Sequence, residues 1–288
     1  MLLKPNLVLA LICIKLLIFA SVIHSSRHVL FLGDSTIFRA SSNFAGNHKC
    51  SITLTRSSRC GDYGLKPAPK RWPPQTCEGP AAFGLKNRGC RDCDGCNGMY
   101  LNCSGSSIAS FEYIPLEFAV DLTLQTDLYE TSQENVFKVY LANRSVDLIV
   151  TNSGFHDMEV CKSGQEYEAS LRKFLGEIST FATAKSAHVI YLPMTRMMVS
   201  LLAPDNPQRS VITNERVQEF NLRADALCKE FGITYLDLHS LSSLIPDKLY
   251  SDVVHIGHKN GVYYRWVSQM VWITYALLLK QDHSAADV

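Results

Sequence analysis

Short apolar runs alternate along the chain with longer segments in which apolar residues recur at helical spacing. The short runs end in or near glycine, proline, asparagine or aspartate, which is typical of buried strands in a parallel sheet. This alternation predicts an α/β fold, a three-layer α/β/α sandwich with a mainly parallel sheet. The five expected strands lie at 27–34, 107–118, 146–154, 186–195 and 232–240.

Helical spacing follows the third, fourth and fifth expected strands. The segments 164–185 and 214–232 have this spacing, and Asn214 is expected to cap the second of them, with Gly232 ending it. The last segment, 260–280, is long and apolar. We expect it to be a helix packed on the core; the alternative is a membrane span.

The region 41–107 does not follow the alternation and holds seven of the ten cysteines. We interpret it as a disulfide-rich insertion within a single domain that covers 26–288. Disulfides are favoured over a metal site in an oxidising compartment, so neither a metal nor a cofactor is expected. The alternative, a zinc or iron–sulfur site, depends on the spacing of Cys90, Cys93, Cys96 and Cys103.

The amino-terminal segment and the glycosylation sequons indicate in which cellular compartment the protein is found. Residues 1–25 form an apolar segment that contains Lys15 and fits a signal peptide or a signal anchor. A cleaved signal is favoured because a charge is costly at mid-membrane. Glycosylation sequons begin at Asn102 and Asn143. We therefore expect a secreted or Golgi or ER lumenal protein, with a single-pass type II membrane protein as the alternative.

Charge and the remaining cysteines add two expectations. The formal net charge of +1 provides no electrostatic footprint for nucleic acid. Nine cysteines follow the targeting segment, an odd number, so one thiol is expected to stay free or to pair between chains. Cys228, in a segment with helical spacing, is the candidate for a buried free thiol.

Ser35 is the first candidate for chemistry, because it follows Gly33 and Asp34 at the end of the first expected strand. A serine at a strand-to-helix turn can act as a nucleophile if a base lies within hydrogen-bonding reach. The alternative is a serine or aspartate that only caps the next helix.

Asp252 and His255 are the second candidate. Their spacing of three residues allows the carboxylate to hold one ring nitrogen of the imidazole, which leaves the other to deprotonate a serine. The alternatives are a surface aspartate with a histidine that caps the last helix, and His258 as a rival base.

The segment 150–157, after the third expected strand, is the third candidate. The Asn152 side-chain amide and a backbone N–H near Gly154 are suited to stabilise an oxyanion. The alternatives are a turn with special backbone angles, and a second dyad made by His156 and Asp157.

The order of these motifs resembles the SGNH/GDSL hydrolase superfamily, within it the PC-esterase branch, whose relatives include the trichome-birefringence-like proteins and the lumenal domain of the sialic acid O-acetyltransferase. The resemblance rests on 31–35, 152–157 and 252–255. It implies that Ser35 is the nucleophile, His255 the base and Asp252 its orienting acid. Asn152 and the Ser35 backbone N–H would then form the oxyanion hole.

Two features depart from the family pattern. The family places a glycine donor after its second strand, whereas Gly105 here precedes the expected strand. Many relatives have an arginine three residues after the serine, where this chain has Phe38, and Arg39 follows one position later. The second oxyanion donor and the role of Arg39 are therefore not assigned by the resemblance.

The resemblance implies a secretory-pathway serine esterase or O-acyltransferase that acts on acyl esters, expected to be acetyl esters, of carbohydrate. The same triad serves both reactions, and neither the acceptor sugar nor the acyl donor follows from these residues. The alternative is a non-catalytic lumenal carbohydrate-binding or structural protein on the same fold. Five aromatic residues are candidates for a sugar-binding face, with packing as their simpler interpretation: Trp72, Tyr100, Tyr263, Tyr264 and Trp266.

Overall fold

The fold is described from a computed structural model. It describes residues 27–47, 70–71, 87–88, 99–103, 108–115, 142–159, 162–257 and 261–286. The expected targeting segment lies outside the described residues, as does most of the expected insertion. Both assignments therefore stay predictions.

A six-stranded sheet forms the middle layer, with strand order β4-β5-β1-β6-β7-β8. Five strands are parallel, and β4 pairs antiparallel with β5 at one edge. This confirms the predicted mainly parallel sheet. The strands are β4 (Met99–Asn102), β5 (Ile108–Pro115), β1 (Arg27–Gly33), β6 (Leu148–Thr151), β7 (His188–Tyr191) and β8 (Thr234–Tyr235). A separate two-stranded ladder joins β2 (Lys70–Arg71) and β3 (Asn87–Arg88).

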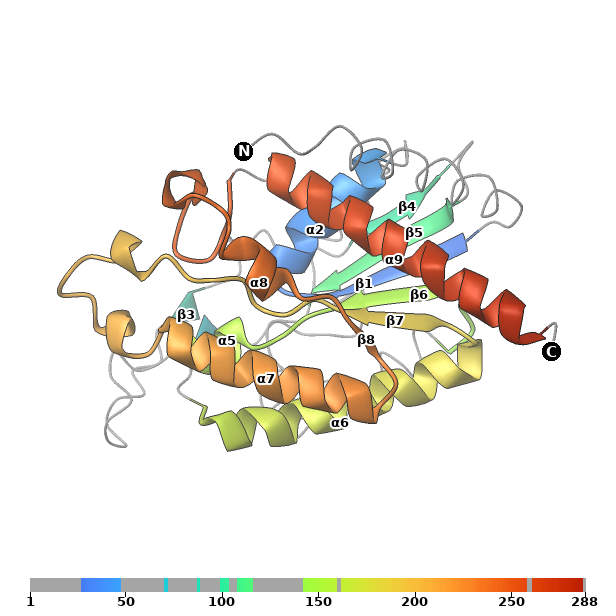
Figure 1. Cartoon of the computed structure of the whole chain (residues 1–288), viewed down its shortest axis with the longest axis horizontal. Helices are drawn as coiled ribbons and strands as arrows, with labels where there is room; N and C mark the ends of the chain where they lie inside the picture. The colour runs from blue at the N-terminus through green and yellow to red at the C-terminus, as the bar shows by residue number, and fades with distance from the viewer. Residues whose placement is uncertain are drawn as a thin grey trace.

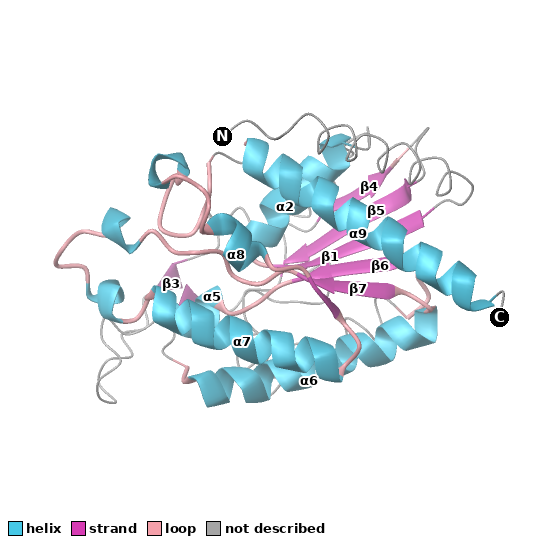
Figure 2. Cartoon of the chain, viewed as in Figure 1, coloured by secondary structure: helices cyan, strands magenta, loops and turns pink. Residues whose placement is uncertain are grey.

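Helices cover both faces of this sheet, as Figures 1 and 2 show. On one face lie α2 (Ser35–Asn47) and α9 (Val262–Ala286), and on the other α6 (Gly164–Lys185) and α7 (Asn214–Glu230). Two short helices, α5 (Phe155–Glu159) and α8 (Leu238–Ser242), lie beyond the carboxyl ends of the strands. The chain is therefore the predicted α/β/α sandwich.

The alternation of side chains along β1 explains why its whole run is apolar. Val29 and Phe31 pack in the cluster under α2 and α9, whereas Leu30 and Leu32 pack in the cluster under α6 and α7. A central parallel strand has no solvent face, so both sets of side chains must be apolar. The strand consequently holds the turn at Gly33 rigidly between two cores.

Most of the predicted elements are confirmed. The strand expected at 232–240 is reduced to β8, because Leu238–Ser242 forms α8, and one predicted cap is wrong. The helix predicted at 164–185 has these bounds, and the capping box at Ser163 and Glu166 explains its sharp start. Asn214 does not cap α7: Thr213 does, by accepting from the Arg216 backbone N–H at 3.3 Å. The Asn214 side chain instead bonds the backbone N–H and carbonyl of Met197.

The last helix packs on the core, as predicted. Val267, Val271 and Tyr275 of α9 are buried against the face of the sheet that α2 also covers. In the part of the chain that the structure describes, no helix is long and apolar enough to cross a membrane.

Two cysteines can be placed. Cys228, on α7, is a buried free thiol, as predicted, and burial raises its pKa to about 12. Cys103 is disulfide-bonded. The other six cysteines of the expected insertion lie outside the described residues, so their pairing stays a prediction.

Candidate active site

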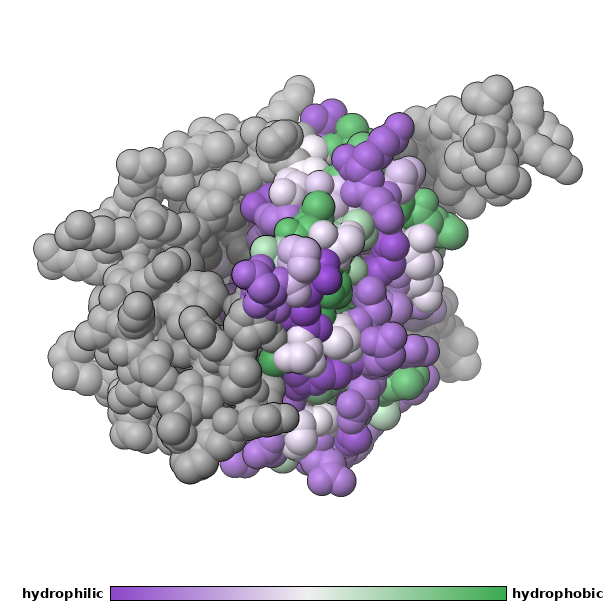
Figure 3. All heavy atoms as spheres, turned by 90° about the vertical axis from the view of Figure 1, so that its left-hand side faces the viewer, coloured by the Kyte–Doolittle hydropathy of each residue, from purple (hydrophilic) through white to green (hydrophobic). Residues whose placement is uncertain are grey.

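The carboxyl ends of the parallel strands meet at one rim of the sheet, where ligands bind in open α/β sheets. The turn from β1 into α2 and the turn from β6 into α5 both lie there. Residues 250–257 lie at the same rim, because the Val253 carbonyl accepts from Met198 N–H after β7, at 2.8 Å. The three predicted segments therefore share one rim. Its described surface is mainly hydrophilic with small hydrophobic areas, as Figure 3 shows.

Asp34 and Asn152 join the ends of β1 and β6. Asp34 N–H donates to Asn152 Oδ1 at 3.1 Å, and Asn152 Nδ2 donates to Asp34 Oδ1 at 2.8 Å. The same carboxylate oxygen accepts from Thr36 N–H at 2.8 Å and so caps the first turn of α2. Both side chains are buried. The Asn152 amide has a second hydrogen, so this pairing leaves it one further donor for an oxyanion.

Gly33 and Tyr113 fix the backbone that leads to Ser35. Tyr113, fully buried on β5, donates its hydroxyl to the Gly33 carbonyl at 3.0 Å. A Cβ on residue 33 would collide with Asn152 Oδ1 and Ile37, so only glycine permits this close approach. The turn is thus set by contacts from β5, β6 and α2 together.

Ser35 is the first residue of α2. Its side chain lies outside the described part of the structure, as does His258. The helix N-terminus favours negative charge that develops near it, and the Ser35 backbone N–H belongs to this first turn.

Asp252 and His255 form the pair that their spacing predicts. His255 Nδ1 lies 2.8 and 2.9 Å from the two Asp252 carboxylate oxygens. Asp252 Oδ1 also accepts from the backbone N–H groups of Val254 and His255, at 2.9 and 2.8 Å. Partial burial opposes ionisation of Asp252, but these hydrogen bonds outweigh it and lower its pKa to about 2. An ionised Asp252 accepts Nδ1–H, which places the ring lone pair on Nε2.

Arg39 ties this pair to α2. It lies one helical turn after Ser35, and positions four apart share a helix face. Arg39 Nη1 donates to the Gly257 carbonyl at 3.3 Å, and its guanidinium lies 5.9 Å from the centre of the Tyr264 ring. The arginine that is out of register with the family thus contacts the segment that carries His255. From the strand side, Thr195 Oγ1 donates to the Val254 carbonyl at 3.4 Å.

The segment after Asn152 turns at Gly154, whose φ of 123° lies in the region that favours glycine. Asp157 is fully buried and accepts from Lys162 Nζ at 2.7 Å, which pins α5 to the start of α6. This carboxylate therefore has a structural partner, which weakens the case for a second dyad with His156.

Three contacts of the site were not predicted from the sequence: those that Asp34, Tyr113 and Arg39 make with Asn152, Gly33 and Gly257. Of the aromatics considered for a sugar face, Tyr263 and Tyr264 are instead buried in the core, and Trp266 packs beside it. The side chains of Trp72 and Tyr100 lie outside the described part. Among the described residues, no group of three or more His, Cys, Asp or Glu side chains is arranged to hold a metal ion.

Comparison with known proteins gives likenesses of structure. No family model matches the chain, and no curated protein does. The chain is similar to Axe2, an acetylxylan esterase from Geobacillus stearothermophilus, at 14% identity and a TM-score of 0.43, over 88% of this chain and 95% of that one. It is also similar to a protein from Slackia heliotrinireducens described as an SGNH hydrolase, at 13% and 0.46, over 87% and 99% of the two chains.

A third likeness is to the lipase/acylhydrolase from Enterococcus faecalis, at 12% identity and a TM-score of 0.43, over 86% of this chain and 94% of that one. At these identities and TM-scores, function is inferred from the geometry of the site and not from the likenesses.

Proposed function

We propose that the chain is a serine esterase or O-acyltransferase that acts on acyl esters, with acetyl esters of carbohydrate as the expected substrates. The observation that carries this proposal is the Asp252–His255 pair, which Arg39 tethers to the helix that begins at Ser35. Asn152 supports it, because its amide lies against Asp34, directly before the serine.

In the proposed reaction, Ser35 Oγ attacks the acyl carbonyl carbon while its proton passes to Nε2 of His255. The ionised Asp252 holds Nδ1–H and stabilises the imidazolium. The Asn152 amide and backbone N–H groups of Ser35 and Gly154 stabilise the oxyanion. Nε2 then gives its proton to the departing alcohol oxygen as the C–O bond breaks, which leaves an acyl ester on Ser35.

The second half of the reaction decides between the two activities. Water attacks the acyl-enzyme to give a carboxylic acid, or a sugar hydroxyl attacks it to give a new ester; His255 takes the proton of the attacking group in both cases. A p-nitrophenyl acetate assay with and without a polysaccharide or sialic acid acceptor separates them. p-Nitrophenol is released in both cases; acetate as the sole acetyl product identifies an esterase, and acetylated sugar identifies a transferase.

Ser35→Ala tests the nucleophile. We expect at least about a 10³-fold loss of kcat, because the oxyanion hole and substrate binding retain only residual activity. Ser284→Ala is the matched control, since this exposed serine lies at the far end of α9. Full activity of Ser35→Ala would refute the proposed triad, and an unmutated chain without activity on these substrates would favour the non-catalytic alternative.

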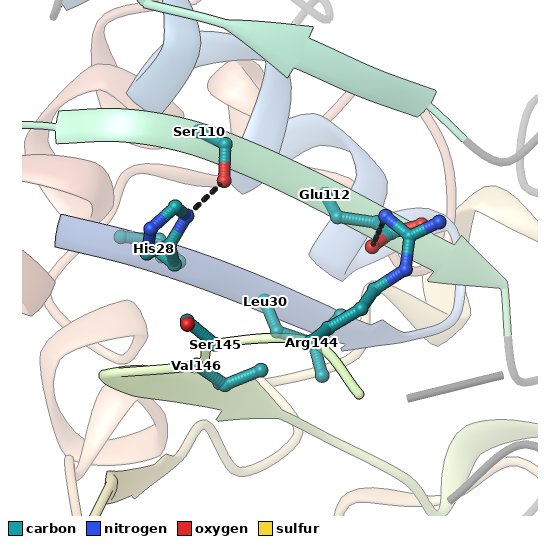
Figure 4. A pocket seen from close by; sticks show the side chains of 8 residues that line it. His28, Leu30, Ser110, Glu112, Arg144, Ser145 and Val146 are labelled. Atoms are coloured by element: carbon teal, nitrogen blue, oxygen red, sulfur yellow. Dashed lines mark hydrogen bonds and ion pairs between the residues drawn. The ribbon is translucent and has the colours of Figure 1, made fainter. Parts of the chain in front are cut away.

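The proposed location is the secretory pathway. The disulfide at Cys103 supports it, since disulfides persist in oxidising compartments. Asn143 supports it too, because it is exposed in a turn. Arg144 turns inward to Glu112, at 3.5 Å, beside a cavity of about 210 Å³ near the start of β1 (Figure 4). A glycan on Asn143 would therefore point into solvent, away from the Ser35 rim.

Expression of the full chain in a eukaryotic cell tests this location. We expect secreted or lumenal protein whose electrophoretic mobility increases on treatment with an N-glycosidase, and Asn143→Gln should remove one glycan step. Extraction of membranes with carbonate separates a cleaved signal from an anchor. Cytosolic protein without glycan would contradict the proposed compartment.

A further inference from the structure

A cluster of hydroxyl groups lies under the turn that carries Gly154. Tyr191, on β7, donates its hydroxyl to the Ser153 carbonyl at 3.1 Å, and Tyr167, on α6, lies 3.4 Å from the same oxygen. The two tyrosine hydroxyls are 3.0 Å apart, and Ser153 Oγ lies 3.2 and 3.4 Å from them. All three residues are buried. The Ser153 carbonyl therefore points into the core, where it contacts the hydroxyls of Tyr191 on β7 and Tyr167 on α6.

Each hydroxyl has one proton to donate, which orders the cluster. Tyr191 makes the shorter contact with the Ser153 carbonyl and is its direct donor. Tyr167 then donates to the Tyr191 oxygen, and Ser153 Oγ donates to one of the tyrosines. Hydrogen bonds in such a chain strengthen one another in a low dielectric. Burial raises the pKa of both tyrosines far above the ordinary value, so both remain protonated donors.

The direction of the Ser153 carbonyl fixes the direction of the next N–H. In a trans peptide the C=O and the N–H of one unit point to opposite sides, and the described residues contain no cis peptide. Since the Ser153 carbonyl points toward the tyrosines in the core, the Gly154 N–H points away from them. The φ of 123° at Gly154 continues the chain from this peptide orientation into α5.

From this geometry we propose that Tyr191, supported by Tyr167, is a positioning residue that aims the Gly154 N–H at the oxyanion of the acyl-transfer reaction. This inference rests on the proposed function. It adds an explanation of how the Gly154 N–H, the third proposed oxyanion donor, is held in place. Neither tyrosine touches the substrate; both act through the Ser153–Gly154 peptide. A donor fixed in advance stabilises the transition state without reorganisation, so its loss should lower kcat more than it changes KM.

Three phenylalanine variants of the full chain test the proposal with p-nitrophenyl acetate. Tyr191→Phe should lower kcat about tenfold, Tyr167→Phe by less, and the double variant by about 10²-fold, within the range seen for loss of an oxyanion donor. KM should change less than twofold in each. Active-site titration of acyl-enzyme normalises kcat to folded protein, so partial unfolding does not imitate the effect.

Tyr235→Phe is the matched control. Its ring stacks on Tyr191 at 6.1 Å between centroids, and its hydroxyl contacts the Asn221 carbonyl, not Ser153. This variant should keep its kcat. An unchanged kcat in the Tyr167/Tyr191 double variant, or an equal loss in Tyr235→Phe, would overturn the positioning role.

The failure of this inference is distinguishable from failure of the proposed function. If Ser35→Ala is inactive while the double tyrosine variant keeps full kcat, the triad stands and the positioning role falls. If Ser35→Ala retains full activity, the proposed function itself falls.

Discussion

The turn after β1 and the segment that carries His255 contribute to the same rim but are held in different ways. Asp34 and Asn152 are 4% exposed and bond to each other between two strands of the core. Asp252, in contrast, has a side chain that is 48% exposed, and most of its bonds are within its own loop. The turn that leads to Ser35 is therefore fixed by contacts of the core, whereas the Asp252–His255 pair is a local structure that a few hydrogen bonds connect to the rest of the rim. Changes in the first should mainly lower the free energy of unfolding, and changes in the second should mainly lower activity.

Gly33→Ala is expected to have the largest effect, because it attacks the core-built turn directly. The added Cβ meets Asn152 Oδ1, which cannot withdraw without breaking its link to Asp34, and Ile37, which is packed in the core under α2. We expect a loss of about 3 kcal/mol or more in the free energy of unfolding, measured by urea denaturation. Gly232→Ala is the control: a Cβ there meets nothing within 4 Å, so only the strain of its φ of 67° remains, about 1 kcal/mol. Equal losses in both variants would show that the β1 turn is not specially constrained.

Asp34→Ala removes the link without adding bulk. The buried Asn152 amide and the Thr36 N–H both lose their partner, and unsatisfied buried groups cost about 1–3 kcal/mol. We expect a loss of about 2–3 kcal/mol in urea denaturation, smaller than that for Gly33→Ala. Asn43→Ala, which removes a side-chain bond to the Arg39 carbonyl within α2, is the comparison and should cost less. A cost for Asp34→Ala below that of Asn43→Ala would contradict a core-built turn.

These contacts show what can and cannot be predicted from sequence. The central strands and α6 were predictable because their signals are local, such as the apolar run of β1 that ends in glycine and the helical spacing of α6. The Asp252–His255 pair was predictable for the same reason, since its two members are three residues apart. Local signals thus identified the contact between Asp252 and His255 and the strand-to-helix turn at Ser35.

Long-range partners could not be predicted in this way. Asp34 and Asn152 are 118 residues apart, and Arg39 and Gly257 are 218 apart, so nothing in either local segment specifies the contact. The error at Asn214 has the same origin. Its residue type favours a cap, but its side chain is hydrogen-bonded to the backbone of Met197, in a preceding loop. Thr213 caps the helix instead.

Arg39→Met tests the contact between α2 and the segment that carries His255. The variant keeps most of the aliphatic stem but loses the bond to the Gly257 carbonyl and the contact with the Tyr264 ring. We expect a loss of about 1 kcal/mol in the free energy of unfolding, together with about a tenfold lower kcat for p-nitrophenyl acetate. Arg265→Met, on an exposed position of α9, is the control and should leave both values unchanged. A loss of stability of about 3 kcal/mol without loss of kcat would place Arg39 with the core instead.

The pH dependence of Asp252 should give the smallest effect on stability, because the carboxylate is half exposed and screened by water. Its pKa is lowered from 3.8 to about 2, since the bonds from His255 and Val254 outweigh the cost of burial. A depressed pKa means that the native state favours the ionised form, so the stabilisation is complete above about pH 4 and is lost as pH falls toward 2. Urea denaturation of the native chain and Asp252→Asn should therefore differ slightly at pH 6 and converge near pH 2. A difference that grows as pH falls would have the wrong sign and would mean that the native loop does not favour the ionised carboxylate.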